Sequence, residues 1–275
     1  MKPLLSVENL RIAFPSRQGP VEVVRGVSFN LGRERLGIVG ESGSGKSQTG
    51  RALLGLTPVS GTATADRLEF DGVDLRNATA KQWRSLRGAR MSMVMQDPKF
   101  SLNPVMTIGK QLMEAVKLHG GKSEARDKSL AMLEAVQIRD PDRVMAAYPH
   151  ELSGGMGQRA MIAMMLVTEP DLLIADEPTS ALDVTVQIEV LRILDNLVTQ
   201  RGMSLIFISH DLKLVSTFCD RVLVMYAGRV VEELDASRMS EASHPYTRGL
   251  LNCLPTITGD SRPLPVLARD DAWLE

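Results

Sequence analysis

Eight residues near the amino terminus constrain the fold of this chain more than any other stretch. They are Gly40, Glu41, Ser42, Gly43, Ser44, Gly45, Lys46 and Ser47. They fit the pattern G-x-x-x-x-G-K-[ST] and lie between an apolar run at residues 36–39, which predicts a strand, and residues 48–56, which predict a helix. This context predicts a phosphate-binding loop, because glycines let several backbone N–H groups turn toward one anion and the helix adds its positive end.

The side chains that close the pattern predict a nucleoside triphosphate as the ligand. We expect Lys46 to reach the β- and γ-phosphates and Ser47 to give its hydroxyl group to Mg²⁺. Gln48, which follows directly, is assigned to the same site. A chance glycine–serine turn is the alternative, and the flanking strand and helix argue against it.

Composition limits the remaining choices. With 275 residues, the chain can form one large α/β domain or a domain with an inserted subdomain. A formal net charge of -1 and 4% aromatic residues do not favour nucleic acid as a partner. Cys219 and Cys253 have no C-x-x-C spacing, which indicates a reducing compartment and neither a disulfide framework nor a zinc site. The start shows no signal-peptide pattern, and no apolar run approaches the ~20 residues of a spanning helix, so another subunit is expected to hold the protein at any membrane.

Strand patterns surround a long helical region. The strands expected in the α/β core lie at residues 91–95, 172–177 and 204–208. Residues 4–14 and 23–31 predict two antiparallel strands, and residues 67–75 predict another short strand and a turn at Asp71 and Gly72. A hairpin is expected over residues 221–233, turning at Ala227 and Gly228. Residues 97–160 predict a helical insertion, and residues 107–168 have the apolar period of helices.

Several polar residues follow the predicted strands. Gln96, Asp176, Glu177 and His210 all stand where an apolar strand ends, which in an open α/β sheet faces the ligand crevice. Asp176 suits Mg²⁺, Glu177 suits a general base or the positioning of water, and His210 suits a contact with the γ-phosphate. Surface positions remain the alternative for each of them.

Phe14 and a second glycine-rich turn are two further candidate parts of a binding site. Phe14 ends a predicted strand, so it is either a core residue at the strand end or a platform on which adenine stacks. Ser153, Gly154 and Gly155 form a second glycine-rich turn that opens a helix and therefore predicts another anion site.

Asp183 is expected to cap a helix that ends at Gly202. The buried face predicted for that helix consists of Val184, Ile188, Leu191, Leu194 and Val198.

Taken in order, these motifs closely resemble the ATPase subunits of ABC transporters over nearly the whole chain. The resemblance implies the following roles: Walker A at residues 40–47, the Q-loop at Gln96, the signature at residues 153–158, Walker B ending in Asp176 and Glu177, the D-loop at Asp183, and the switch histidine at His210. It implies catalytic roles for Glu177, His210 and Gln96, Mg²⁺ contacts for Ser47, Gln96 and Asp176, and adenine stacking for Phe14. The implied cofactors are ATP and Mg²⁺.

The resemblance implies a P-loop NTPase core with an antiparallel β subdomain and an inserted helical subdomain. The expected single domain, residues 1–275, divides into a core of 1–96 and 161–240, a helical subdomain of 97–160 and an extension of 241–275. Its implied partners are a paralogous ATPase subunit, two integral membrane permease subunits and a solute-binding protein that acts through the permeases. The implied location is the cytoplasmic face of the bacterial inner membrane.

Short stretches narrow the resemblance to the oligopeptide, dipeptide and nickel importer branch. They are Gln96-Asp97-Pro98, Ser101-Leu102-Asn103-Pro104, Tyr148-Pro149-His150-Glu151 and His244-Pro245-Tyr246-Thr247. The branch implies import of peptides, with nickel or a metal chelate as the alternative. Many relatives carry a cysteine-rich extension thought to hold an iron–sulfur cluster, and Cys253 alone predicts no cluster here.

Two other classes of protein remain as rivals. A soluble ABC ATPase of DNA repair or translation usually has two cassettes or a long coiled-coil insertion, and 275 residues with a short insertion argue against both. A P-loop kinase would not explain the turn at residues 153–155 or the histidine at 210.

Overall fold

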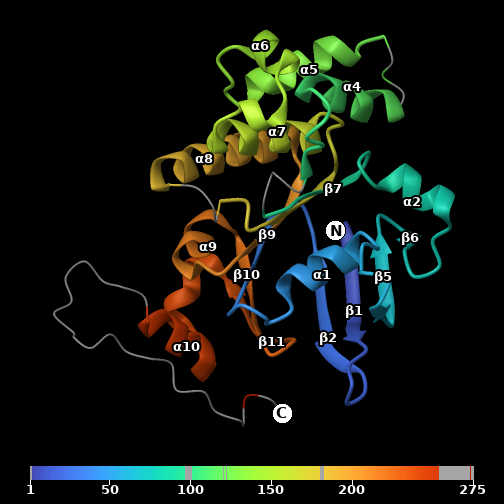
Figure 1. Ribbon diagram of the computed structural model, residues 1–275. Helices are drawn as coiled ribbons and strands as arrows, with labels where there is room; N and C mark the ends of the chain where they lie inside the picture. Colours follow the sequence, from blue (N-terminus) through green and yellow to red (C-terminus); the bar gives the residue numbers. More distant parts are fainter. Residues whose placement is uncertain are drawn as a thin grey trace. The chain divides into compact units, whose positions relative to one another are not determined.

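The structure is a computed structural model that describes residues 2–96, 101–119, 121, 123–179, 183–253 and 273. The chain forms two compact units, one of residues 1–77 and 206–275 and the other of residues 78–205. The strand end expected at Asp97 and Pro98 lies outside the described residues, as does most of the extension beyond residue 253. Figure 1 labels the helices and strands.

The first unit contains most of the strands. Its elements are β1 (Leu5–Phe14), β2 (Val21–Leu31), β3 (Arg35–Val39), α1 (Lys46–Leu53), β4 (Thr62–Thr64), β5 (Arg67–Phe70), β6 (Val73–Asp74), α9 (Leu212–Phe218), β10 (Arg221–Tyr226), β11 (Arg229–Asp235), the 3₁₀ segment η2 (Ala236–Glu241) and α10 (Pro245–Asn252). β9 (Ser204–Ser209) begins in the second unit and ends in the first.

The strands of the first unit form an antiparallel sheet and a mixed set of strands (Figure 1). The antiparallel sheet has the order β2-β1-β5-β6, and β4 pairs with β1. In the mixed set, β10 pairs in parallel with β3 and antiparallel with β11. Both predicted turns are confirmed: φ is 46° at Ala227 and 86° at Gly228, and 45° at Asp71 and 83° at Gly72. Consecutive positive φ angles are those that tight hairpins require.

The second unit is mainly helical. Its elements are α2 (Ala80–Leu86), β7 (Met91–Val94), α4 (Ile108–Leu118), α5 (Ala125–Ala135), α6 (Pro141–Ala146), the 3₁₀ turn η1 (Pro149–Glu151), α7 (Gly154–Leu166), β8 (Leu172–Asp176) and α8 (Val184–Arg201). The helices α4, α5, α6 and α7 pack on one another, and β7 pairs in parallel with β8. The helical character predicted for residues 107–168 is confirmed.

The prediction for α8 is wrong at its start. The side chains of Leu191, Leu194 and Val198 are buried as expected, but Val184 is 71% exposed and Ile188 is 46% exposed. Helical periodicity shows which residues share a face, but it does not show how far along the helix the covering elements extend. Asp183 does cap the helix, since its Oδ1 accepts a hydrogen bond from Val186 N at 3.1 Å, and Gly202 ends it with a φ of 60°.

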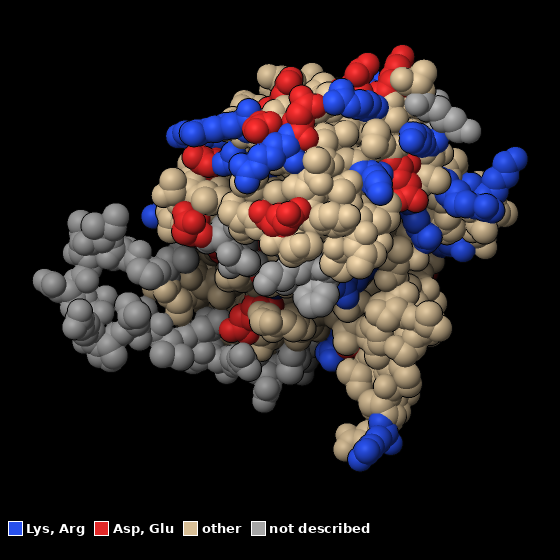
Figure 2. Space-filling model, turned by 45° about the horizontal axis from the view of Figure 1, so that its top comes forward, with Lys and Arg blue, Asp and Glu red and all other residues tan. Residues whose placement is uncertain are grey.

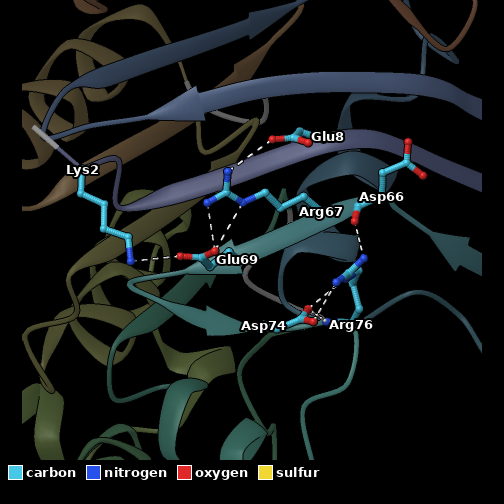
Figure 3. A network of polar contacts seen from close by, with 7 residues as sticks. All are labelled: Lys2, Glu8, Asp66, Arg67, Glu69, Asp74 and Arg76. Carbon is cyan, nitrogen blue, oxygen red and sulfur yellow. Dashed lines mark hydrogen bonds and ion pairs between the residues drawn. The ribbon is translucent and has the colours of Figure 1, made fainter.

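Charged side chains tie the antiparallel sheet together at its surface. Arg67 of β5 lies between Glu69 on its own strand, 3.0 Å away, and Glu8 of β1, 3.4 Å away (Figure 3). Arg76 lies 2.9 Å from Asp74 of β6. The face shown in Figure 2 likewise carries Lys and Arg side chains among Asp and Glu, in keeping with a formal net charge of -1.

The pair of Asp74 and Arg76 predicts a pH dependence of stability. Hydrogen bonds from the Arg76 side chain lower the pKa of Asp74 from 3.8 to about 2. A carboxyl group whose pKa falls on folding stabilises the folded state above its unfolded pKa and loses that effect as the pH falls through its folded pKa. We therefore expect Asp74→Asn to lower the free energy of unfolding at pH 6, and the gap to narrow between pH 4 and pH 3.

Urea denaturation at pH 6, 4 and 3 measures this gap. We expect it to be small even at pH 6, because both side chains are partly exposed and solvent screens the pair. A gap that stays constant over this pH range would contradict the assigned pKa.

Candidate functional site

The loop at residues 40–47 has a backbone that only glycine accommodates at two positions. Gly40 and Gly45 have φ angles of 152° and 98°. A Cβ atom on Gly40 would lie 2.1 Å from the Met225 carbonyl oxygen, and one on Gly45 would lie 2.6 Å from the Val23 carbonyl oxygen. The loop is thus pressed against β10 and β2, and its path leaves no room for larger residues.

Lys46 is turned back into its own loop. Its side chain is buried, and Nζ donates hydrogen bonds to the carbonyl oxygens of Gly40 and Glu41, each at 2.8 Å. The Ser44 hydroxyl oxygen is a third acceptor at 3.4 Å. A buried ammonium group needs such partners because burial disfavours its charge. An anion that enters the loop meets a cation already held in place.

The loop and the helix after it fit a phosphate group. The amino end of α1 begins at Gly45 with no side-chain cap, whereas α4, α7 and α8 are each capped by a side chain. Helix starts leave N–H groups that need an acceptor, and phosphate oxygens can supply it. A Cβ on Gly43 would meet nothing within 4 Å, so the loop is open at its centre.

Sequence reasoning missed one residue at this loop. The Tyr246 hydroxyl oxygen of α10 accepts a hydrogen bond from the backbone N–H of Glu41 at 3.1 Å. Tyr246 lies 205 positions further along the chain. The sequence signalled it only through the stretch His244-Pro245-Tyr246-Thr247, which does not indicate where the tyrosine points.

Phe14 and His210 are predicted site residues of the first unit that lie outside the loop and α1. Phe14 is half-buried at the end of β1, and a Cβ on Gly61 would lie only 2.6 Å from its ring. Gly61 therefore lies directly against the ring. His210 is exposed immediately after β9, and Asp211 next to it caps α9 through a bond from Leu214 N at 3.0 Å.

The second unit brings Gln96, Asp176 and Glu177 together. Asp176 is 4% exposed at the end of β8. Glu177 has a φ of 46°, a left-handed conformation that is uncommon for a residue other than glycine. Gln96 Nε2 donates a hydrogen bond to Glu177 Oε2 at 3.2 Å. The parallel pairing of β7 with β8 places both strand ends on one edge, which explains this contact.

A cavity of about 630 Å³ adjoins the turn at residues 153–155 in the second unit. Its lining includes Ser153, Gly154 and Gly155, and also the following side chains: Arg139, Arg143, Arg159, Asp140 and Asp183. Ser153 caps α7 by accepting a bond from Met156 N at 3.4 Å, and a hydroxyl group that accepts can still donate.

Both carboxylates of this cavity already serve as helix caps. Asp140 accepts from Arg143 N and Asp183 from Val186 N, each at 3.1 Å. Three arginines and the start of α7 line the cavity together with these two carboxylates. Arg159 also pairs with Glu189, which links α7 to α8. Gln158 Nε2 donates a hydrogen bond to the Pro178 carbonyl oxygen, which links α7 to the segment after β8.

The predicted residues therefore form two groups, each within one unit. The first consists of Phe14, the loop at 40–47, Gln48 and His210, and the second of Gln96, Ser153, Gly154, Gly155, Asp176, Glu177 and Asp183. Within the described ranges, no group of three or more His, Cys, Asp or Glu side chains could hold a metal ion. The same part of the chain contains no helix with both the length and the apolar character needed to span a bilayer.

This α/β arrangement of a glycine-rich loop between strand and helix is that of a P-loop ATPase. Residues 24–180 match the family described as ABC transporter. The chain therefore belongs to the ABC transporter family, and it is an ATPase of that family.

Comparisons with individual proteins agree with this assignment. The chain is 46% identical over 268 residues to the dipeptide transport ATP-binding protein DppD of Escherichia coli K12, covering 96% of this chain and 82% of that protein. It is also 46% identical to the oligopeptide transport ATP-binding protein OppD of Haemophilus influenzae, over 96% of this chain and 83% of that one. The solved ATP-binding cassette MJ0796, bound to ADP and Pi, has the same fold, with a TM-score of 0.74 at 23% identity over 84% of this chain and 98% of that chain.

Proposed function

We propose that this chain is the ATP-hydrolysing subunit of an importer that takes up peptides. The observation that carries the proposal is 46% identity over 96% of the chain to a dipeptide transport ATP-binding protein. The proposed complex contains two integral membrane permease subunits and a solute-binding protein that acts through them. It would place this chain on the cytoplasmic face of the inner membrane.

The residues of the first unit would hold ATP. The backbone N–H groups of the loop at 40–47 and of α1 would bind the phosphates, and Lys46 would keep its bond to the Gly40 carbonyl oxygen while it turns its other donors to phosphate oxygens. Ser47, Gln96 and Asp176 would supply protein oxygens to Mg²⁺, which commonly keeps waters and substrate phosphates as its other ligands. Bound ATP supplies the phosphoanhydride bond whose cleavage drives transport.

Glu177 is the residue we assign to the attacking water. Its left-handed backbone is the kind of strain that functional sites retain, and the Gln96 amide fixes one carboxylate oxygen at 3.2 Å. The other oxygen could accept a proton from water. His210, exposed after β9, would contact the γ-phosphate.

The second glycine turn would serve another subunit. The loop at 40–47 already provides one phosphate cradle in this chain, so we assign Ser153, Gly154, Gly155 and the arginine-lined cavity to the ATP of a paralogous partner cassette. The exposed Val184 and Ile188 beside Asp183 support a partner at this surface, because a subunit interface buries such apolar groups.

The role of Glu177 predicts a defect in chemistry rather than in binding. Glu177→Gln keeps the shape of the side chain but removes the base, so we expect ATP hydrolysis to slow by about 10²–10⁴ while ATP still binds. Glu134→Gln, at an exposed position of α5, is the matched control and should hydrolyse normally. Near-normal turnover by a pair in which both equivalent glutamates are replaced would contradict the assignment.

The proposed assembly predicts the effect of a carboxylate in the second glycine turn. Gly154 is the better position for it, because a Cβ there meets nothing within 4 Å, whereas one on Gly155 would press on Val186 Cγ1 at 2.9 Å. We expect Gly154→Asp to leave this chain's own ATP affinity unchanged. Repulsion of the partner's triphosphate should weaken ATP-driven dimer formation by at least about tenfold, since facing like charges cost several kcal/mol.

Binding and dimer formation are measured in parallel for this variant, with Ser123→Asp at an exposed position before α5 as the control. Loss of ATP affinity with normal dimer formation would show that the turn serves its own chain.

The adenine-stacking role of Phe14 predicts a ligand-dependent effect. Stacking on one aromatic ring is worth about 1–3 kcal/mol, so Phe14→Ala should weaken MgATP binding by about fivefold or more. Magnesium tripolyphosphate has no base, and its affinity should not change. Calorimetric titration with both ligands tests this, and equal losses for the two would show that Phe14 acts on the phosphate loop or the fold instead.

A further inference from the structure

Tyr246 brings a helix from the carboxyl end of the chain into contact with the phosphate loop. Its side chain is fully buried, and its ring packs against that of Tyr226 with centroids 4.5 Å apart. Its hydroxyl oxygen accepts the Glu41 N–H at 3.1 Å. α10 lies outside residues 24–180, the part that matches the family, so the family match does not explain this contact.

The bond from Glu41 matters because of the peptide unit to which this N–H belongs. The same unit contains the Gly40 carbonyl group, whose oxygen accepts a hydrogen bond from Lys46 Nζ at 2.8 Å. A peptide unit is planar and rigid, so its N–H and C=O groups move together. The Tyr246 hydroxyl group therefore holds the N–H group of the peptide unit whose carbonyl group binds Lys46.

The start of α10 is itself anchored, so the hydroxyl group has a defined place. Glu232 Oε1 on β11 accepts hydrogen bonds from Ser243 Oγ at 2.9 Å and from His244 N at 3.2 Å. His244 caps the helix by accepting from Tyr246 N at 3.2 Å. A continuous series of contacts thus runs from β11 through α10 to the phosphate loop, all within the first unit.

We propose that Tyr246 is a positioning residue for nucleotide binding. It orients the Gly40–Glu41 peptide and, through it, Lys46, so that the loop is ordered before the phosphates arrive. Ordering a loop in advance increases affinity because binding no longer has to pay for it. The inference rests on the proposed function of this loop, and it links the position of α10 to the affinity for nucleotide.

Tyr246→Phe tests the proposal because it removes only the hydroxyl group and keeps the packed ring. In the full-length chain, we expect the affinity for MgATP to fall by about threefold to tenfold, the size expected from one hydrogen bond. Amide hydrogen exchange in a peptide covering residues 38–46 should become faster, because the Glu41 N–H loses its acceptor. Tyr226→Phe is the matched control: it removes a hydroxyl group from the other ring of the tilted pair and should change neither measurement.

Two results would overturn the proposal. One is an unchanged or tighter affinity for MgATP in Tyr246→Phe. The other is an equal loss in Tyr226→Phe, which would show that any change to the ring pair disturbs the fold. Lys46→Ala separates this inference from the proposed function: if that variant binds MgATP normally, the loop is not the site, and if it loses binding while Tyr246→Phe does not, only the positioning role fails.

Discussion

The hydrogen bonds of the Lys46 ammonium group are the interaction on which the site depends. A buried cation is tolerated only where acceptors surround it, and here the acceptors are the carbonyl groups of Gly40 and Glu41. Those carbonyl groups point inward because the loop passes close against β2 and β10, and these strands leave no room for a Cβ at Gly40 and Gly45. The strands thus fix the path of the loop, and the loop positions the Lys46 ammonium group. This ammonium group in turn enables the loop to bind phosphate.

The remaining predicted site residues are divided between the two units of the chain. Phe14, the loop and His210 lie in one unit, while Glu177, Gln96 and the glycine turn at 153–155 lie in the other. Each of these residues stands at a strand end or a helix start, where polar groups can leave the core without a desolvation cost. The cavity beside Ser153 and the exposed Val184 and Ile188 are the features that support the proposed pairing with a second cassette.

Rules that involve only neighbouring residues predicted the turns and the helix cap from the sequence. Contacts between distant segments account for the features that the sequence did not predict. The turns at Asp71 and Ala227 and the cap at Asp183 depend on neighbouring residues, and the structure confirms them. The burial of Val184 was predicted wrongly because periodicity does not say where packing stops. The bond from Tyr246 to Glu41 joins residues 205 positions apart, and no local pattern could have indicated it. The positions of Asp97 and Pro98 lie outside the described residues.

We propose that this chain binds ATP alone but hydrolyses it only when a second cassette completes the site. Steady-state ATP turnover per subunit, measured over a range of concentrations with and without the partner ATPase, tests this most directly. We expect very slow turnover where the chain is monomeric and a steep rise as the partner is added. Full turnover by the monomer, independent of concentration and of the partner, would contradict it.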